Sequence, residues 1–190
     1  MRPDFNIVVI GGSAGSLSRV LRLLPHLTKK LNISVILIFH RREDEDSVLH
    51  AVLAYKSEFI VKEVEDKDPI MRHHIYIAPA DYHLLLEKNL TFSLDISEKV
   101  NFSRPSIDVT FESAADAFGD SVTGLLLSGA NADGVVGLEA IRKLGGKIAV
   151  QDPRSAEVSY MPQQAVDRLA IDLLLTEFNI EDFLNLVNRK

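Results

Sequence analysis

The sequence has no cysteine among its 190 residues. Without a thiol the chain cannot use a cysteine nucleophile, form disulfide bonds or bind a metal through cysteine. It also lacks an apolar run long enough to span a membrane, because its longest apolar stretches are the size of strands. The residues after Met1 lack the apolar core of a signal peptide. These absences predict a cytoplasmic protein with no segment inserted in a membrane.

The chain also has no excess of basic residues. The chain has 21 Lys and Arg against 27 Asp and Glu, which gives a formal net charge of −6. Proteins that bind nucleic acid usually carry a basic domain or stripe, so we expect no nucleic-acid partner, although a local basic patch is compatible with this charge. No long linker, repeat or low-complexity segment interrupts the sequence. Residues 1–190 are therefore predicted to form one domain.

Buried strands alternate with amphipathic helices along much of the chain. The continuous apolar runs at 5–10, 33–39 and 122–127 predict strands that are buried on both faces. Helical spacing of apolar residues after Gly15 predicts a helix with Ser16 as its N-cap. Further strands are expected at 58–64, 74–78, 83–87, 90–94, 147–150 and 171–175, and helices near 48–53, at 107–118, 135–144 and 162–168, and from 180. The alternation predicts a three-layer αβα sandwich around a mostly parallel sheet, with an antiparallel hairpin region in the middle of the chain.

Three chemically active side chains follow three of the predicted strands. Gly11-Gly12-Ser13-Ala14-Gly15 fits the Gly-x-Ser-x-Gly turn that exposes a nucleophilic serine between a strand and a helix. His40 follows the second strand, and Asp133 ends the loop after a later strand. The carboxyl ends of parallel strands meet at one edge of a sheet, so these side chains are expected to lie together. Serine needs a base, and the base needs an orienting carboxylate, which matches these residue types.

Each residue alone has a simpler explanation. The glycine-rich segment fits an ordinary turn, a histidine at a strand end is usually structural, and Asp133 before Gly134 fits a helix N-cap. The coincidence of all three at one predicted edge favours catalysis. The turn matches neither a phosphate-binding loop nor a dinucleotide-binding fingerprint. The chain order Ser, His, Asp also differs from the Ser, Asp, His order of α/β-hydrolases.

Longer segments resemble a known family, the catalytic domain of the chemotaxis protein-glutamate methylesterases (CheB type). The similar segments are IGGSAGS at 10–16, the strand leading to His40, HIYIAPADYHLLLE at 74–87, SRPSIDVTFESAA at 103–115, LLLSGANADGVVGLEAIRKLGG at 125–146 and AVQDPRSAEVSYMPQQAV at 149–166. The resemblance implies hydrolysis of γ-glutamyl methyl esters on the cytoplasmic helices of chemoreceptors, and in some members deamidation of glutamine. It implies Ser13 as nucleophile, His40 as general base and Asp133 as orienting acid, with no metal or cofactor.

The sequence departs from the family pattern near these residues. Ala14 follows the nucleophile where threonine is usual, and Ala130 and Ala132 replace a methionine and an asparagine. The backbone N–H groups of Ala14 and Ala130 are still expected to stabilise an oxyanion, although a lost side-chain donor can cost about 10²–10³ in turnover. Two alternatives therefore stay open: a weak or inactive module that binds receptor or signalling proteins, and an esterase or amidase with another substrate.

Substrate contact and regulation are the remaining expectations. Arg41, Arg42 and Arg104 are candidates for a basic rim that attracts an acidic receptor helix, with Arg104 the one most expected to contact substrate. Arg41 and Arg42 fit equally well a solvated turn paired with residues 43–46. Family members typically carry an N-terminal receiver domain, for which the early first strand leaves no room. A stand-alone enzyme, a fragment or control by a partner chain is therefore expected.

Overall fold

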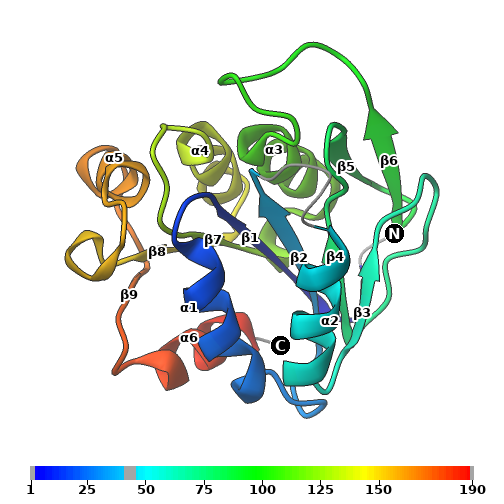
Figure 1. Ribbon diagram of the computed structural model, residues 1–190, viewed down its shortest axis with the longest axis horizontal. Helices are drawn as coiled ribbons and strands as arrows, with labels where there is room; N and C mark the ends of the chain where they lie inside the picture. Colours follow the sequence, from blue (N-terminus) through cyan, green and yellow to red (C-terminus); the bar gives the residue numbers. More distant parts are fainter. Residues whose placement is uncertain (1–2, 41–45, 189–190) are drawn as a thin grey trace.

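Seven parallel strands form the central sheet of the protein. The computed structural model describes residues 3–40 and 46–188. The strands are β1 (Asn6–Gly12), β2 (Ile33–Phe39), β3 (Ile60–Glu63), β4 (His74–Ile77), β7 (Val122–Leu126), β8 (Lys147–Gln151) and β9 (Leu173–Leu175). Their spatial order is β3-β4-β2-β1-β7-β8-β9, and every neighbouring pair is parallel. The parallel sheet predicted from the sequence is confirmed (Figure 1).

Helices cover both faces of this sheet. The helices are α1 (Ser16–Leu23), α2 (Asp46–Lys56), α3 (Ile107–Phe118), α4 (Val135–Lys143), α5 (Tyr160–Arg168) and α6 (Ile180–Val187), with short 3₁₀ turns at Leu24–His26, Gly119–Ser121 and Pro153–Ser155. Side chains of β1 alternate between two cores, Ile7 and Val9 facing α3, α4 and α5, and Val8 and Ile10 facing α1, α2 and α6. The three layers are visible in Figure 1. Burial of the sheet on both faces explains its continuous apolar strands.

Antiparallel pairing is narrower than the sequence suggested. Among residues 3–40 and 46–188, only β5 (His83–Glu87) and β6 (Thr91–Asp95) form a hairpin, as a separate two-stranded sheet. The segment at 74–77, expected within the hairpin region, is instead β4 and pairs in parallel with β2 and β3. Its residues Ile75, Tyr76 and Ile77 are buried on both faces, which is the environment of an interior strand.

The start of α1 also differs from expectation. Gly15, not Ser16, is the N-cap of α1, with a left-handed φ of 77° that glycine adopts readily. Ser16 is the first helical residue, and its hydroxyl turns back to donate to the Ser13 carbonyl at 2.6 Å.

In the parts of the chain that the structure describes, no helix combines the length and apolar character needed to cross a membrane.

The sheet has its topological switch at β1. The chain runs from β1 to β2 on one side and later returns to place β7 on the other. Ligand sites of open parallel sheets form at such a switch, beyond the carboxyl ends of the strands. The turn after β1, the residue after β2 and the loop after β7 are therefore the segments that can build a site.

Candidate active site

The turn after β1 is shaped to present one serine. A Cβ on Gly12 would lie 2.5 Å from the Cβ of Ser16, so the close approach of turn and helix requires glycine at position 12. The N–H of Ser13 donates to the Ser128 carbonyl at 2.9 Å, and the Ser13 carbonyl accepts from the N–H of Ser16. Backbone hydrogen bonds thus fix Ser13 on both sides and leave the residue partly exposed.

His40 lies beside this turn because of the strand register. Gly12 of β1 pairs with Phe39 of β2, and Ser13 and His40 are the residues that directly follow this pair. The N–H of His40 donates to the Gly12 carbonyl at 3.3 Å and so extends the ladder past the strand ends. Within residues 3–40 and 46–188, no hydrogen bond joins the two side chains. Bonds of this kind often tighten only when substrate is bound.

Asp133 contacts His40 from the loop after β7. Its Oδ2 lies 2.8 Å from Nε2 of His40, and the aspartate is fully buried. Strands β2, β1 and β7 are neighbours, so residues far apart in the chain meet at one edge of the sheet. Ser13, His40 and Asp133 therefore stand at the carboxyl ends of three adjacent strands, as the spacing predicts.

The rest of the Asp133 carboxylate is saturated by donors from the start of α3 and the loop before it. These donors are the N–H of Ile107 at 2.7 Å, the N–H of Asp108 at 3.0 Å, the hydroxyl of Ser106 at 2.9 Å and the side-chain amide of Asn101 at 3.2 Å. The N–H groups belong to the first turn of α3, which has no internal partner for them. Asp133 thus caps α3 and not its own helix α4, whose N-cap is Gly134.

A second buried carboxylate, Asp108, lies next to Asp133. Its Oδ1 accepts from the N–H groups of Gly134 and Gly137, both at 2.8 Å, at the start of α4. Helices α3 and α4 therefore exchange caps, since the aspartate before α4 caps α3 and the aspartate in α3 caps α4. Asp108, Ser106 and Asn101 were not predicted as site residues. The only local signal was Ser106 before an apolar helix, which is typical of an N-cap.

The two carboxyls differ in their electrostatics. Burial opposes ionisation of Asp133, but hydrogen bonds from His40 and from the start of α3 outweigh it and hold the pKa of Asp133 below its usual value. Burial raises the pKa of Asp108 to about 6, and the negative charge of Asp133 adds to that rise. Asp133 is thus stabilised as the charged partner of an imidazole, whereas Asp108 ionises reluctantly.

The predicted oxyanion and substrate residues fall into two groups. Ala14 and Ala130 are exposed, and the described hydrogen bonds use neither of their N–H groups. The guanidinium of Arg104 instead holds its own loop, donating to Asp81 and to the carbonyls of Ile96 and Ser97. Arg104 therefore organises the loop between β6 and α3, while residues 41–42, the other rim candidates, lie outside the described residues.

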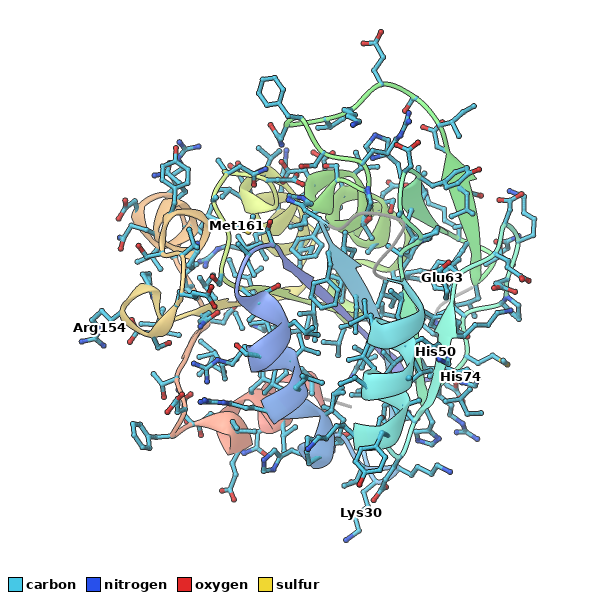
Figure 2. All side chains as sticks on the ribbon, in the orientation of Figure 1. Lys30, His50, Glu63, His74, Arg154 and Met161 are labelled. Carbon is cyan, nitrogen blue, oxygen red and sulfur yellow. The ribbon has the colours of Figure 1, made fainter. Side chains whose placement is uncertain are left out.

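Two packing features support the loop after β7. Met161 of α5, labelled in Figure 2, packs against Gly129, where an added Cβ would lie 2.4 Å from the end of the methionine side chain. The Gly129 N–H donates to Val158 at 3.1 Å, and its carbonyl accepts from Met161 at 2.9 Å. The loop that carries Ala130 is thus clamped by the segment leading into α5.

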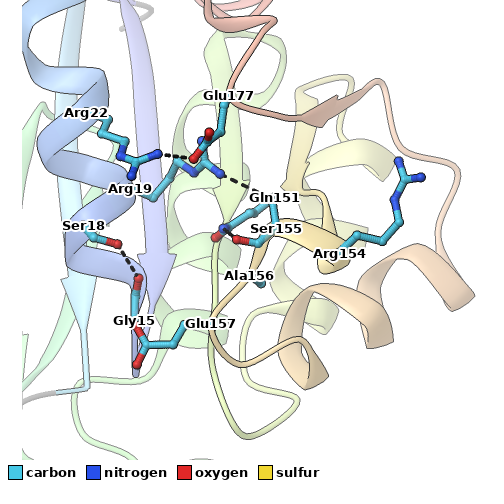
Figure 3. A pocket seen from close by; sticks show the side chains of 10 residues that line it. All are labelled: Gly15, Ser18, Arg19, Arg22, Gln151, Arg154, Ser155, Ala156, Glu157 and Glu177. Carbon is cyan, nitrogen blue, oxygen red and sulfur yellow. Dashed lines mark hydrogen bonds and ion pairs between the residues drawn. The ribbon is translucent and has the colours of Figure 1, made fainter.

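A pocket of about 230 Å³ lies next to the turn after β1, between α1 and the loops after β8 and β9. Figure 3 shows Arg22 paired with Glu177 and the buried Arg19 donating to the Ser155 hydroxyl, at 3.2 Å. Burial lowers the pKa of Arg19. Glu157 and Glu177 also line the pocket, and Arg154, its third guanidinium group, pairs with Asp152, so positive and negative charges balance. The pocket therefore has no clear preference for an anion.

No group of three or more His, Asp or Glu side chains that could hold a metal ion is found within the described ranges. Fold and site together define an α/β protein that places a hydroxyl, an imidazole and a buried carboxylate at the ends of adjacent parallel strands.

Comparisons with known proteins identify the family. The model of the CheB methylesterase family matches residues 8–184. A protein of Leptospira interrogans named "putative protein-glutamate methylesterase/protein-glutamine glutaminase" is 40% identical over 173 residues, which cover 91% of this chain and 90% of that protein. A protein-glutamate methylesterase/protein-glutamine glutaminase of Thermotoga maritima is 30% identical over 94% of this chain and 53% of its own length.

The fold agrees with this relationship. The crystal structure of the Thermotoga maritima CheB methylesterase catalytic domain superimposes with a TM-score of 0.90 at 30% identity, covering 96% of this chain and 98% of that one. The chain belongs to the CheB methylesterase family.

Proposed function

We propose that this protein is a protein-glutamate methylesterase that uses Ser13, His40 and Asp133 to hydrolyse γ-glutamyl methyl esters on chemoreceptor helices in the cytoplasm. The observation that carries the proposal is the buried Asp133 carboxylate, 2.8 Å from the His40 imidazole, beside the turn that presents Ser13. A buried carboxylate at this distance fixes the ring and stabilises its protonated form, which is the requirement for activating a serine.

In the proposed mechanism each ring nitrogen of His40 has a separate role. The Asp133 carboxylate only accepts hydrogen bonds, so Nε2 carries the proton that it shares with Asp133 and Nδ1 keeps its lone pair. Nδ1 accepts the Ser13 proton as Oγ attacks the ester carbonyl. The imidazolium then protonates the departing methoxide, and methanol leaves. A water deprotonated by His40 hydrolyses the glutamyl-serine ester and restores both groups.

Backbone N–H groups would stabilise the tetrahedral intermediate. Those of Ala14 and Ala130 lie on exposed loops at the turn and after β7, with no partner among the described hydrogen bonds. Neither role needs a particular side chain, so alanine at these positions is compatible with catalysis. Attack on a glutamine amide would follow the same steps with ammonia as the leaving group, so the site also supports deamidation.

The experiment that tests the proposal compares wild type with Ser13→Ala. A methylated receptor preparation should release methanol with wild type, and the variant should lose activity by on the order of 10⁶-fold. A fluorophosphonate probe should label wild type and not the variant, with the thermal unfolding midpoint unchanged. Labelling without methanol release would indicate a hydrolase with another substrate, and neither signal would favour a binding module.

A further inference from the structure

We propose that Asp108 is a positioning residue, which through the bridging amide of Asn101 and the start of α4 holds Asp133 in register with His40. The inference rests on the proposed function, because it concerns the efficiency of the same site. Asp108 and Asp133 share one hydrogen-bond donor. Nδ2 of Asn101 lies 2.9 Å from Oδ2 of Asp108 and 3.2 Å from Oδ1 of Asp133. Both neighbours are carboxylate oxygens, so one amide nitrogen serves both acids.

The two oxygens of Asp108 perform separate tasks. Oδ1 accepts from Gly134 and Gly137, and Gly134 directly follows Asp133, so this oxygen fixes the backbone next to the acid. Oδ2 accepts only the Asn101 amide among the described hydrogen bonds. Position 108 therefore restrains Asp133 twice, once through the chain and once through Asn101. Asp108 does not touch the imidazole itself, which is bonded to Asp133.

Asn101 ties the same cluster to the loop between β6 and α3. It has a left-handed backbone with φ 50°, and Asn131, whose side chain accepts from the Asp133 N–H at 3.2 Å, lies within 3.5 Å of the Asn101 carbonyl. The amide bridge is thus part of a closed set of contacts around the acid. Loss of the bridge would free the carboxylate to move relative to His40, and a misplacement of about 1 Å can cost on the order of 10²-fold in rate.

The charge on Asp108 decides whether the bridge exists. An ionised Oδ2 accepts from Asn101, whereas a protonated Oδ2 presents a hydrogen to an amide that is itself a donor. The titratable groups around Asp108 are Asp133 from the loop before α4, Glu112 from α3 itself, His40 beyond Asp133, and His83 of β5, which accepts from the Ser106 N–H. No Lys or Arg within the described ranges pairs with Asp108. With a pKa raised to about 6, the bridge forms as the pH rises through that value.

The experiment measures the ratio of wild-type to Asp108→Asn kcat/KM from pH 5 to pH 8. The variant keeps an oxygen for Gly134 and Gly137 but presents an amide to Asn101. We expect a ratio of about 10 at pH 8 that falls towards 1 at pH 5, since wild type then loses the same charge. A purely structural role would give a ratio that does not change with pH, and that result would overturn the proposal.

A second comparison keeps the test decisive if Asp108→Asn folds poorly. Asn101→Gly removes the amide, keeps the left-handed backbone and leaves both helix caps in place. At pH 8 Asn101→Gly should lower kcat/KM by about the same factor as Asp108→Asn. The double variant should be little slower than Asn101→Gly alone. If the two factors multiplied in full in the double variant, the result would contradict the bridge. Asp68→Asn, a remote carboxylate that accepts the Glu65 N–H at 2.8 Å, is the matched control.

The same ratios are also measured as the rate of fluorophosphonate labelling, which requires no natural substrate. Failure of methanol release with normal labelling would count against the methylesterase proposal alone. A labelling ratio that is constant with pH would count against the role of Asp108 alone. An unlabelled wild type would overturn both.

Discussion

The two sides of the site hold their reacting groups in different ways. Ser13 is placed by main-chain bonds to Ser128 and Ser16 and by a turn too tight for a Cβ at Gly12. Asp133 is placed by a side-chain and helix-terminus network, in which its carboxylate receives five hydrogen bonds at 2.7–3.2 Å. One side depends on shape, and the other depends on charge and donors.

This difference predicts which changes each side tolerates. The turn after β1 should accept new side chains at exposed positions such as Ala14 but reject added volume next to the helix. The acid side should accept little change in charge or in hydrogen-bonding capacity, because an unmatched buried donor costs about 1–3 kcal/mol. The comparison is tested by variants of each kind.

Among the variants that test this comparison, Asp133→Asn is expected to have the largest effect. The amide would turn an N–H towards groups that already donate, either His40 and Ile107 or Ser106 and Asp108. Methanol release should fall on the order of 10⁴-fold, with a loss of unfolding free energy of about 1–3 kcal/mol. Turnover and urea unfolding of the purified variant measure the two effects. A variant that retains a tenth of the wild-type activity would remove Asp133 from the proposed triad.

Gly12→Ala tests the opposite side, where volume and not charge is at stake. The new Cβ would lie 2.5 Å from the Ser16 Cβ, so α1 or the turn must shift. We expect a loss of about 1–3 kcal/mol in unfolding free energy, together with slower labelling of Ser13. Ala14→Ser, at an exposed position in the same turn, should stay within about 0.5 kcal/mol of wild type. Equal effects of the two changes would refute the shape argument.

The same contrast explains what the sequence could and could not predict. The limits of β2 and α3 followed from local patterns, a continuous apolar run and helical spacing, and both were confirmed. Ser13 and His40 were predicted because each directly follows a strand, and Asp133 was predicted because it ends the loop after β7. The parallel pairing of β4 was missed because pairing partners are set by long-range packing. The bridge from Asn101 was missed because it joins α3, α4 and a loop that touch only in the folded chain.

Asp108→Asn also gives a stability test that is independent of catalysis. An unfolded aspartate titrates near 3.9, whereas burial raises the native pKa of Asp108 to about 6. Below pH 4 the group is protonated in both states and costs nothing. Between pH 4 and pH 6 the native state keeps a proton that the unfolded state has released, so wild type loses stability relative to the variant as the pH rises, and the loss is complete above pH 6. The difference in unfolding free energy should shift by on the order of 2 kcal/mol between pH 4 and pH 7.5, measured by urea titration.

The smallest expected effect concerns Phe102, which sits next to Asn101 and is 98% exposed. Because it buries almost nothing, Phe102→Ala should leave the unfolding free energy within about 0.5 kcal/mol of wild type. Its loop projects at the top of Figure 1 beside the proposed site, so a receptor helix bound there would cover the ring. KM for methylated receptor should then rise several-fold, while fluorophosphonate labelling stays unchanged. Phe178→Ala is the matched control, because that ring is 97% exposed and belongs to the segment between β9 and α6, which lies at the lower left of the same view. A similar change in KM for both variants would show that the loop between β6 and α3 makes no specific contact with the substrate.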